Sequence, residues 1–344
     1  PIRKVSLIVE EPVMVMPGGH SIGVILRSQG VVITGFAPVD TIDGRQVWPA
    51  KNSGAEIGDI ILSIDDQKIK GKEDLSVAVD AAGRTGQWLD ILLKKPDGST
   101  LRKAIAPVKH KDGGYRLGLY VKDSLAGVGT LTFYQEETNL YTALGHVIAD
   151  NDSKRPLTME EGQIVRSTVT GIQPSKKGSP GEFLGVFVED QDVIGNIIKN
   201  GSCGISGMLS QPLVNPYYSK AIPLGLPSQL VKGPAEVLTT VNGRKIEKFE
   251  IEIESIFTSG SASSKGFMIK ITDDKLLSST GGIVQGMSGS PIIQNGRLIG
   301  AITHVLVNDP TKGYGAFAQW MAQEAYIVPG VTDADYRAAF KTFQ

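Results

Sequence analysis

A glycine-rich hexapeptide, GMSGSP at 286–291, holds the residue types that nucleophilic catalysis needs. Ser288 lies in it between Gly286 and Gly289, shortly before the strand-like pair Ile292-Ile293. Glycines permit a tight turn in which the N–H groups of Gly286 and Ser288 point at one place, as an oxyanion hole requires. Similar turns also join ordinary strands, so the hexapeptide alone is compatible with either a serine nucleophile or a plain connection.

A serine nucleophile needs a neighbouring base, and two histidines lie in suitable surroundings. His146 follows Gly145 and precedes a β-favouring pair, and His304 lies in a strand-like run soon after Ser288. In chain order His146 comes before Ser288, which is the order of histidine and serine in chymotrypsin. We therefore predict His146 as the base, with a packed or surface histidine as the alternative.

The sequence after the serine resembles the nucleophile loop and the next strand of chymotrypsin-like proteases. Ser288-Gly289-Ser290-Pro291 is followed by an apolar pair, a turn and then Gly300-Ala301-Ile302-Thr303. The apolar Met287 departs from the family pattern, in which a polar or acidic residue is usual at that position. The resemblance implies a set of substrate-binding residues in the strand: Thr303, His304 and Val305.

Short β-favouring segments separated by turns have to position these residues. They recur from Tyr115 to Val307, with hairpin signals such as Asn242-Gly243 and little helical periodicity. Many short strands with few helices predict a β-barrel or a pair of barrels. We expect helices in this region only near its end, over 317–325 and 333–343.

A different pattern precedes the strand-rich region. The segment SGAEIGDIILSIDDQKI at 53–69 is followed by an amphipathic stretch, 72–82, with acidic residues in its first turn, where the helix dipole favours them. Two strands are predicted around the turn Pro96-Asp97-Gly98-Ser99, over 88–94 and 101–108. This order resembles a PDZ domain over 12–108, and the segment 53–69 carries the resemblance most specifically.

The resemblance implies a peptide-binding groove. PDZ domains add an extended peptide to a sheet edge and bind its terminal carboxylate with loop N–H groups. Here the loop at 21–24 would bind the carboxylate and the helix would line the groove. The implied contact residues are Ser21, Ile22, Gly23, Val24, Leu75 and Val79. A small α/β domain with a degenerate groove is the alternative, and the insertion 39–52 has no assigned role.

Three features together resemble a narrower family, the sporulation stage IV B serine peptidases of endospore-forming bacteria. They are the segment 281–317, the motif YTALGHVI at 141–148 and the PDZ-like pattern. The resemblance implies export to the space between mother cell and forespore, with anchoring by an N-terminal membrane segment that this sequence does not include. It also implies cleavage of the enzyme itself and of the regulator of an intramembrane metalloprotease, which leads to activation of a late mother-cell sigma factor.

The same resemblance implies a catalytic triad: His146, Asp273 and Ser288. The aspartate departs from the chymotrypsin template, in which the acid follows the histidine well before the serine. Asp273 instead lies shortly before Ser288. Three other aspartates stay open as the acid: Asp190, Asp192 and Asp274.

Composition excludes several classes of function. The 344 residues carry a formal net charge of −1, which gives no global reason to expect nucleic-acid binding. The single cysteine, Cys203, cannot form an intrachain disulfide or a multi-cysteine zinc site, and we expect it to be a small buried residue. No apolar run is long enough to span a bilayer. No metal or organic cofactor is implied.

The sequence thus predicts a mainly β chain in four parts. These are an N-terminal segment 1–11, a PDZ domain 12–108 (a small α+β sandwich), a linker 109–114 and a chymotrypsin-like β-barrel serine protease domain 115–344. The predicted function is a serine endopeptidase that acts on protein substrates and binds peptide termini at the PDZ groove. The alternative is a non-catalytic PDZ-containing signalling scaffold with a degenerate protease barrel.

Overall fold

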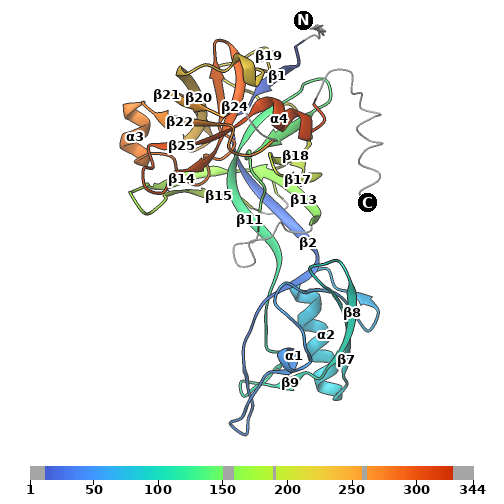
Figure 1. Cartoon of the computed structure of the whole chain (residues 1–344). Coiled ribbons are helices and arrows are strands. Elements are labelled where there is room, and N and C mark those ends of the chain that lie inside the picture. The colour runs from blue at the N-terminus through green and yellow to red at the C-terminus, as the bar shows by residue number, and fades with distance from the viewer. Residues whose placement is uncertain (1–11, 150–158, 189–190, 258–261, 328–344) are drawn as a thin grey trace, which may run out of the picture. The chain divides into compact units, whose positions relative to one another are not determined.

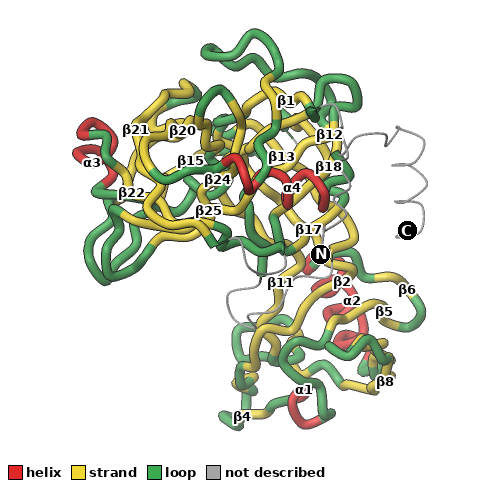
Figure 2. The backbone as a smooth tube through the Cα atoms, turned by 45° about the horizontal axis from the view of Figure 1, so that its top comes forward, coloured by secondary structure: helices red, strands yellow, loops and turns green. Residues whose placement is uncertain are grey.

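The chain divides into two compact units. The computed structural model describes residues 12–149, 159–188, 191–257 and 262–327. Unit 1 comprises Pro1–Ile25, Ala126–Ile148 and Gly162–Gln344, and unit 2 comprises Leu26–Leu125 and Ala149–Glu161. Strands, yellow in Figure 2, account for most of the regular structure of both units, and helices are few. The chain is therefore mainly β, as predicted.

Two of the unit boundaries fall inside long strands. Strand β2 (Ser21–Phe36) and strand β11 (Leu119–Tyr134) each begin in one unit and end in the other. Residues 12–25, predicted to begin the PDZ domain, therefore lie in unit 1. The predicted linker 109–114 is the turn of a hairpin between β9 (Val108–Lys109) and β10 (Tyr115–Arg116) in unit 2. Composition does not reveal these boundaries because a continuous strand carries no linker-like residues.

Unit 2 is an antiparallel sheet packed against one long helix (Figure 1). The second half of β2 pairs with β5 (Ile60–Ile64), which is followed in the sheet by β7 (Leu89–Lys94) and β8 (Thr100–Ile105). Helix α2 (Lys72–Thr85) buries an i, i+4, i+7 row of apolar residues in the core of this unit. The predicted helix and both predicted strands are confirmed. The short elements of unit 2 are β3 (Val39–Asp40), β4 (Gln46–Val47), α1 (Pro49–Asn52) and β6 (Gln67–Lys68).

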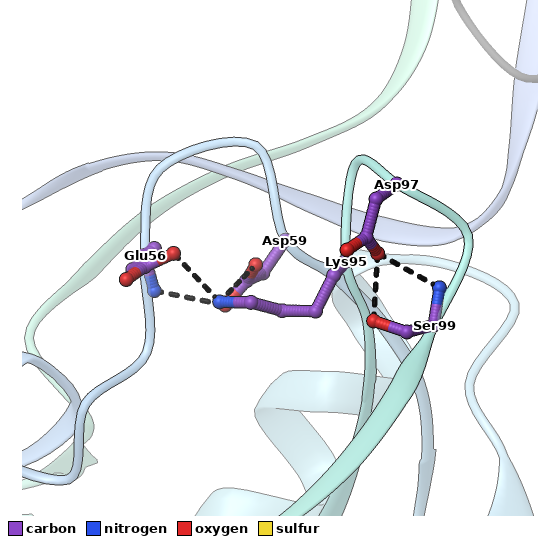
Figure 3. Close-up of polar contacts among 5 residues, drawn as sticks. All are labelled: Glu56, Asp59, Lys95, Asp97 and Ser99. Atoms are coloured by element: carbon purple, nitrogen blue, oxygen red, sulfur yellow. Dashed lines mark hydrogen bonds and ion pairs between the residues drawn. The ribbon is translucent and has the colours of Figure 1, made fainter.

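A buried ion pair fixes the turn that precedes β5 (Figure 3). The Asp59 carboxylate is fully buried; it accepts a hydrogen bond of 2.9 Å from the Glu56 N–H and lies 2.9 Å from Lys95 Nζ. Lys95 also contacts the Glu56 carboxylate at 2.7 Å. In the next turn, Asp97 accepts hydrogen bonds from the N–H and hydroxyl of Ser99. Charged side chains thus join two turns of unit 2.

Unit 1 contains a closed antiparallel barrel of six strands. Their order around the barrel is β20 (Gly233–Asn242), β21 (Lys245–Ile256), β22 (Phe267–Ile271), β25 (Lys312–Phe317), β24 (Arg297–Val305) and β23 (Pro291–Gln294). Val237, Phe249 and Phe267 are at most 2% exposed in its core. Alternating apolar residues of these strands fill the interior, which is why a barrel is predictable from the strand pattern.

A second group of strands in unit 1 carries the sequence around His146. Here β12 (Leu140–Ala143) lies between β11 and β18 (Gly204–Met208), and β18 forms a hairpin with β17 (Lys199–Gly201). In the described residues these strands form an open sheet, so of the two predicted alternatives, one barrel or a pair, the described residues show one closed barrel. The remaining strands are β1 (Met14–Pro17), β13 (Met159–Arg166), β14 (Thr168–Gln173), β15 (Glu182–Val186), β16 (Val193–Asn196) and β19 (Ile222–Pro223).

Two short α-helices complete unit 1. Helix α4 (Ala318–Glu324) matches the prediction over 317–325, and the predicted helix 333–343 lies outside the described residues. Helix α3 (Asp274–Thr280) was not predicted, and a 3-10 turn spans Pro227–Gln229. Along the described ranges, no helix has the length and apolar character that crossing a membrane requires.

Candidate functional site

The turn that carries Ser288 has a backbone that only glycine fits. Gly286 and Gly289 have φ values of 100° and 93°, a region that disfavours residues with a side chain. A Cβ atom on Gly289 would lie 2.0 Å from the carbonyl oxygen of Thr130. The Gly289 N–H donates to Ile302 in β24, and the Ser290 N–H donates to Met287, which is fully buried. The predicted tight turn is therefore confirmed.

Strand β11 holds the same turn from another direction. The Thr130 N–H donates to the Ser288 carbonyl at 2.9 Å, and the Thr130 hydroxyl donates to the Gly286 carbonyl at 2.8 Å. No acceptor among the described residues takes the N–H groups of Gly286 or Ser288. Two rigidly held donors without an internal partner are what an oxyanion hole needs. Sequence reasoning missed Thr130, because nothing local connects it to a turn far along the chain.

His146 lies at the end of β12, after two residues with left-handed backbone. Leu144 and Gly145 have φ values of 71° and 74°, so the chain turns sharply before the histidine. The Nδ1 atom of His146 donates to the Val147 carbonyl at 2.9 Å. The proton of the neutral ring is therefore on Nδ1, which leaves Nε2 as the basic nitrogen. Burial lowers the pKa of His146 below its usual 6.5, so the ring is neutral at pH 7.

Strand β24 connects the serine to the histidine. The Ser288 hydroxyl donates to the Thr303 carbonyl at 3.0 Å, and the next residue, His304, has its ring 5.1 Å from the ring of His146. A Cβ atom on Gly145 would lie 2.6 Å from Thr303, so the histidine loop packs against this strand. The structure thus gathers the predicted nucleophile, the predicted base and two predicted substrate-binding residues at one place.

The other residues of this strand have defined surroundings. Thr303 donates its hydroxyl to the carbonyls of Ser264 and Tyr314, so its side chain braces the strand. The pKa of His304 is lowered to about 4 by burial, by His146 and by Lys265. His304 is therefore neutral at pH 7 and adds no positive charge beside the base. Val305 pairs with Gly313 of β25 at the end of the strand.

The Asp273 carboxylate lies at the start of helix α3. It caps α3 by accepting from the Leu276 N–H at 2.9 Å, and it also accepts from the Glu250 N–H at 3.3 Å. In the barrel, His304 pairs with Tyr314 and Tyr314 pairs with Met268. Asp273 follows Met268 by five residues, about 16 Å of extended chain. The predicted contact between Asp273 and His146 is absent from the described residues.

The three alternative acids do not replace it. Asp274 lies in the first turn of α3, and Asp192 is paired with Arg244 at 3.3 Å. Asp190 lies outside the described residues. Within the described ranges, no carboxylate forms a hydrogen bond with His146. Its orientation rests on the Val147 carbonyl instead.

The predicted PDZ contacts lie in two separate units. Residues 21–24 form the start of β2 and not a loop, and all four residues are buried in unit 1. A Cβ atom on Gly23 would lie 2.5 Å from Phe187, so this backbone is closely packed. Leu75 and Val79 are buried in the core of unit 2. The residues predicted to form the groove therefore belong to different units, Ser21, Ile22, Gly23 and Val24 to unit 1 and Leu75 and Val79 to unit 2.

Cys203 and the acidic residues show no metal-binding arrangement in the part of the chain that the structure describes. No group of three or more histidine, cysteine, aspartate or glutamate side chains there is placed to hold a metal ion. Cys203 is 1% exposed, and burial raises the pKa of its thiol to about 11. It is a small buried residue, as predicted, and it is not a reactive thiolate at pH 7.

Among solved structures, serine proteases match this chain at low TM-scores. The active form of the Rv3671c protease from M. tuberculosis matches with a TM-score of 0.32 and 17% identity, covering 60% of this chain and 76% of that chain. An inactive form of it matches with a TM-score of 0.30 and 16% identity over 59% and 85%. The HtrA-type protease AlgW, in a variant bound to a decapeptide, matches with a TM-score of 0.36 and 8% identity over 62% and 55%.

Sequence families give a firmer assignment. A search of curated proteins returns no match. The family described as SpoIVB peptidase S55 matches residues 113–322, which is more than half of the chain. This range contains the Ser288 turn and His146, and it agrees with the resemblance seen in the sequence. The chain is therefore a serine peptidase of the SpoIVB peptidase S55 family.

Proposed function

We propose that this chain is a serine endopeptidase that works through an acyl-enzyme, with Ser288 as nucleophile and His146 as general base. One observation carries the proposal: a glycine turn with two uncommitted N–H donors presents Ser288 beside a neutral histidine whose Nε2 is basic. In the first step the Ser288 hydroxyl leaves the Thr303 carbonyl and turns to His146. Nε2 takes its proton while the oxygen attacks the scissile carbonyl.

The tetrahedral intermediate places a negative oxygen between the N–H groups of Gly286 and Ser288. Each such donor contributes about 3–4 kcal/mol in comparable sites. The protonated His146 then gives its proton to the leaving amine, and the same residue activates water to release the second product. Rigid donors matter because no reorganisation is needed when the charge develops.

The end of strand β24 offers an edge along which the backbone of a substrate can pair. Strand β23 pairs with β24 only as far as Ala301, so residues Thr303–Val305 lie beyond the last β23 pair. An extended substrate that pairs along this segment would bring its scissile bond to Ser288, since the Ser288 hydroxyl already contacts the Thr303 carbonyl. This supports the predicted roles of Thr303, His304 and Val305 in substrate binding.

We further propose the biological role that the family resemblance implies. The enzyme would cleave itself and the regulator of an intramembrane metalloprotease, in the space between mother cell and forespore, and so lead to activation of a late mother-cell sigma factor. Family membership supports this role. We also propose that unit 2 is a PDZ-type module, supported by its antiparallel sheet, helix α2 and the turn at Asp59. A peptide groove on it would use residues other than 21–24, which are buried in unit 1.

Fluorophosphonate labelling tests the catalytic proposal. These probes form a covalent adduct only with an activated serine, so we expect one adduct, located on Ser288 by peptide mass mapping. Ser288→Ala should remove both labelling and self-cleavage, whereas the control Ser278→Ala, an exposed serine of α3, should retain them. Full proteolysis by purified Ser288→Ala protein would disprove the proposal. Absence of labelling in the folded wild-type protein would favour the non-catalytic scaffold.

A further inference from the structure

A single peptide unit connects His146 to an asparagine from another strand. The Val147 carbonyl accepts the Nδ1–H of His146 at 2.9 Å. The N–H at the other end of this peptide belongs to Ile148, and it donates to Asn200 Oδ1 at 2.8 Å. Asn200 Nδ2 also donates to the Ile148 carbonyl at 2.8 Å. Asn200 thus binds the residue next to the carbonyl that orients the imidazole, through both of its backbone polar groups.

Because a peptide unit is rigid, the hydrogen bond that the Ile148 N–H donates to Asn200 also affects the Val147 carbonyl at the other end of the same peptide. A trans peptide is planar, with its C=O and N–H pointing in opposite directions. A hydrogen bond at the N–H end therefore fixes the plane in which the carbonyl points, and it polarises that carbonyl as an acceptor. Asn200 consequently controls both the direction and the strength of the bond to His146 Nδ1. In the described residues that bond fixes the tautomer and orientation of the ring, which is one of the two roles of a triad carboxylate.

The asparagine is itself held in place. Asn200 pairs with Ile205 in the β17–β18 hairpin, and Ile205 also pairs with Ala143, at the end of the strand that leads to His146. Glu324 of α4 accepts from the N–H groups of Ser202 and Cys203 at the hairpin turn, at 2.9 and 2.5 Å. One frame of paired strands therefore fixes Asn200 relative to the histidine loop.

We infer that Asn200 is the positioning residue for the general base, acting through the Val147–Ile148 peptide. The inference rests on the proposed roles of Ser288 and His146. Asn200 binds backbone only, and its effect is to hold the tautomer of His146 in which Nε2 is free to accept the proton of Ser288.

Few other titratable groups bear on this connection. His304 of β24 faces His146 and, with its pKa of about 4, stays neutral above pH 5. The positive charge of Lys265 contributes to the lowered pKa of His304, and Lys199 lies beside the Glu324 carboxylate at the β17–β18 hairpin. A change in the titration of His146 in Asn200 variants therefore reports on the Val147–Ile148 peptide, because the variants leave these groups in place.

Two substitutions at Asn200 separate positioning from mere stability. Asn200→Ala removes both bonds and weakens the Val147 carbonyl as an acceptor, so we expect the pKa of His146 to fall further and the labelling rate of Ser288 to drop about tenfold. Asn200→Asp keeps the acceptor for the Ile148 N–H and adds a negative charge. It should retain most of the labelling rate and shift the acid limb of the pH–rate profile to higher pH.

The matched control is Asn196→Ala. The Asn196 side chain, from β16, accepts from the Met208 N–H of β18 at 2.8 Å, and among the described residues it makes no hydrogen bond to the histidine loop. We expect a lower Tm and an unchanged acid limb. If both Asn200 variants lower Tm while leaving the acid limb and the labelling rate unchanged, the role is structural and the inference is wrong.

Nuclear magnetic resonance distinguishes failure of this inference from failure of the proposed function. Titration of the ¹⁵N-labelled imidazole of His146, assigned with His146→Gln, measures its tautomer and pKa without any turnover. A pKa that moves in opposite directions in the two Asn200 variants supports the inference even if Ser288 were unreactive. A pKa that stays fixed in both variants overturns it even if the enzyme is active.

Discussion

Two turns of this molecule each contain a glycine with a left-handed φ and are stabilised in different ways. Gly58 before Asp59 in unit 2 and Gly289 after Ser288 in unit 1 have φ values of 94° and 93°. The Asp59 turn is held by charged side chains, with Lys95 between two carboxylates. The Ser288 turn is held by backbone bonds from β11 and β24, and two of its N–H groups stay uncommitted.

The difference separates a structural turn from a reactive one. In the Asp59 turn, the charged side chains of Glu56, Asp59 and Lys95 pair with one another, which stabilises the turn. In the Ser288 turn, neighbouring strands supply the rigidity, which leaves donors and a hydroxyl available for a substrate. A nucleophilic side chain next to a buried ion pair would be held in place by the charged groups, and their electric field would also change its reactivity.

The largest effect on stability and labelling is expected when a closely packed left-handed glycine, Gly289, is substituted; Gly296, which lies in open space, is the control. Gly289→Ala places a Cβ atom 2.0 Å from the Thr130 oxygen at a left-handed φ, so we expect a loss of about 3 kcal/mol in unfolding free energy and complete loss of Ser288 labelling. Gly296→Ala has a φ of 71° but open space, so it should cost about 1 kcal/mol and keep labelling. Urea unfolding and fluorophosphonate labelling measure both. Normal labelling of Gly289→Ala protein would show that the turn tolerates movement.

Removal of the buried charge in unit 2 should have the next largest effect. Asp59→Ala leaves Lys95 with Glu56 alone, and we expect a loss of about 2–3 kcal/mol, less than for a fully buried pair because the Lys95 side chain is 20% exposed. Ser288 labelling should stay unchanged under folding conditions. Asp97→Ala, in the adjacent exposed turn, is the control and should change stability much less. Equal loss in both variants would contradict a special role for Asp59.

The pH dependence of this ion pair has a definite sign. Hydrogen bonds to Glu56 and then to Asp59 raise the pKa of Lys95 above its ordinary 10.5. The stabilisation is therefore fully present below pH 10.5 and is lost as the pH rises through the higher folded value. Asp59→Ala should flatten alkaline unfolding of unit 2 relative to wild type.

The smallest effect is expected at Asp273. Serine caps helices as well as aspartate does but cannot act as a triad acid, so Asp273→Ser should keep stability within about 0.5 kcal/mol and Ser288 labelling within about twofold. Asp273→Ala should lose about 1 kcal/mol, because the Leu276 N–H loses its partner. A hundredfold loss of labelling in folded Asp273→Ser protein would restore this residue to the triad.

The parts of the site that sequence could predict are local. Ser288 and its glycines lie within a few residues of one another, and the left-handed φ values follow from the glycines themselves. The strand pattern of the barrel and helix α2 have their own periodicity, so they too were predictable. The family resemblance implies Asp273 as the triad acid, with Asp274 as one alternative, but aspartate ahead of a short helical stretch is also a cap signal, and Asp273 is the N-cap of α3.

The rest of the site depends on contacts between distant segments. Thr130 and Asn200 have ordinary sequence surroundings, and only strand pairing brings them to the Ser288 turn and the His146 loop. Glu324 of α4 likewise reaches the hairpin turn at Ser202 and Cys203 only through the fold. At residues 21–24 the sequence predicts a functional feature that the structure does not have. Their glycine pattern suggests a binding loop, but pairing with the rest of unit 1 makes them a buried strand.

The crossing of β2 and β11 between the units has a consequence for how the chain folds. Met16 pairs with Tyr134, so unit 1 has to close a loop that contains nearly all of unit 2. The Ser28 hydroxyl donates to the Asp123 carbonyl, close to where the chain enters and leaves unit 2. If unit 2 folds first, it brings these two points together and shortens the loop that β1 and β11 must close. A folded unit 2 would thus lower the entropy cost of closing this loop. Destabilising unit 2 would then slow the assembly of the peptidase unit, although no residue of the active site is altered.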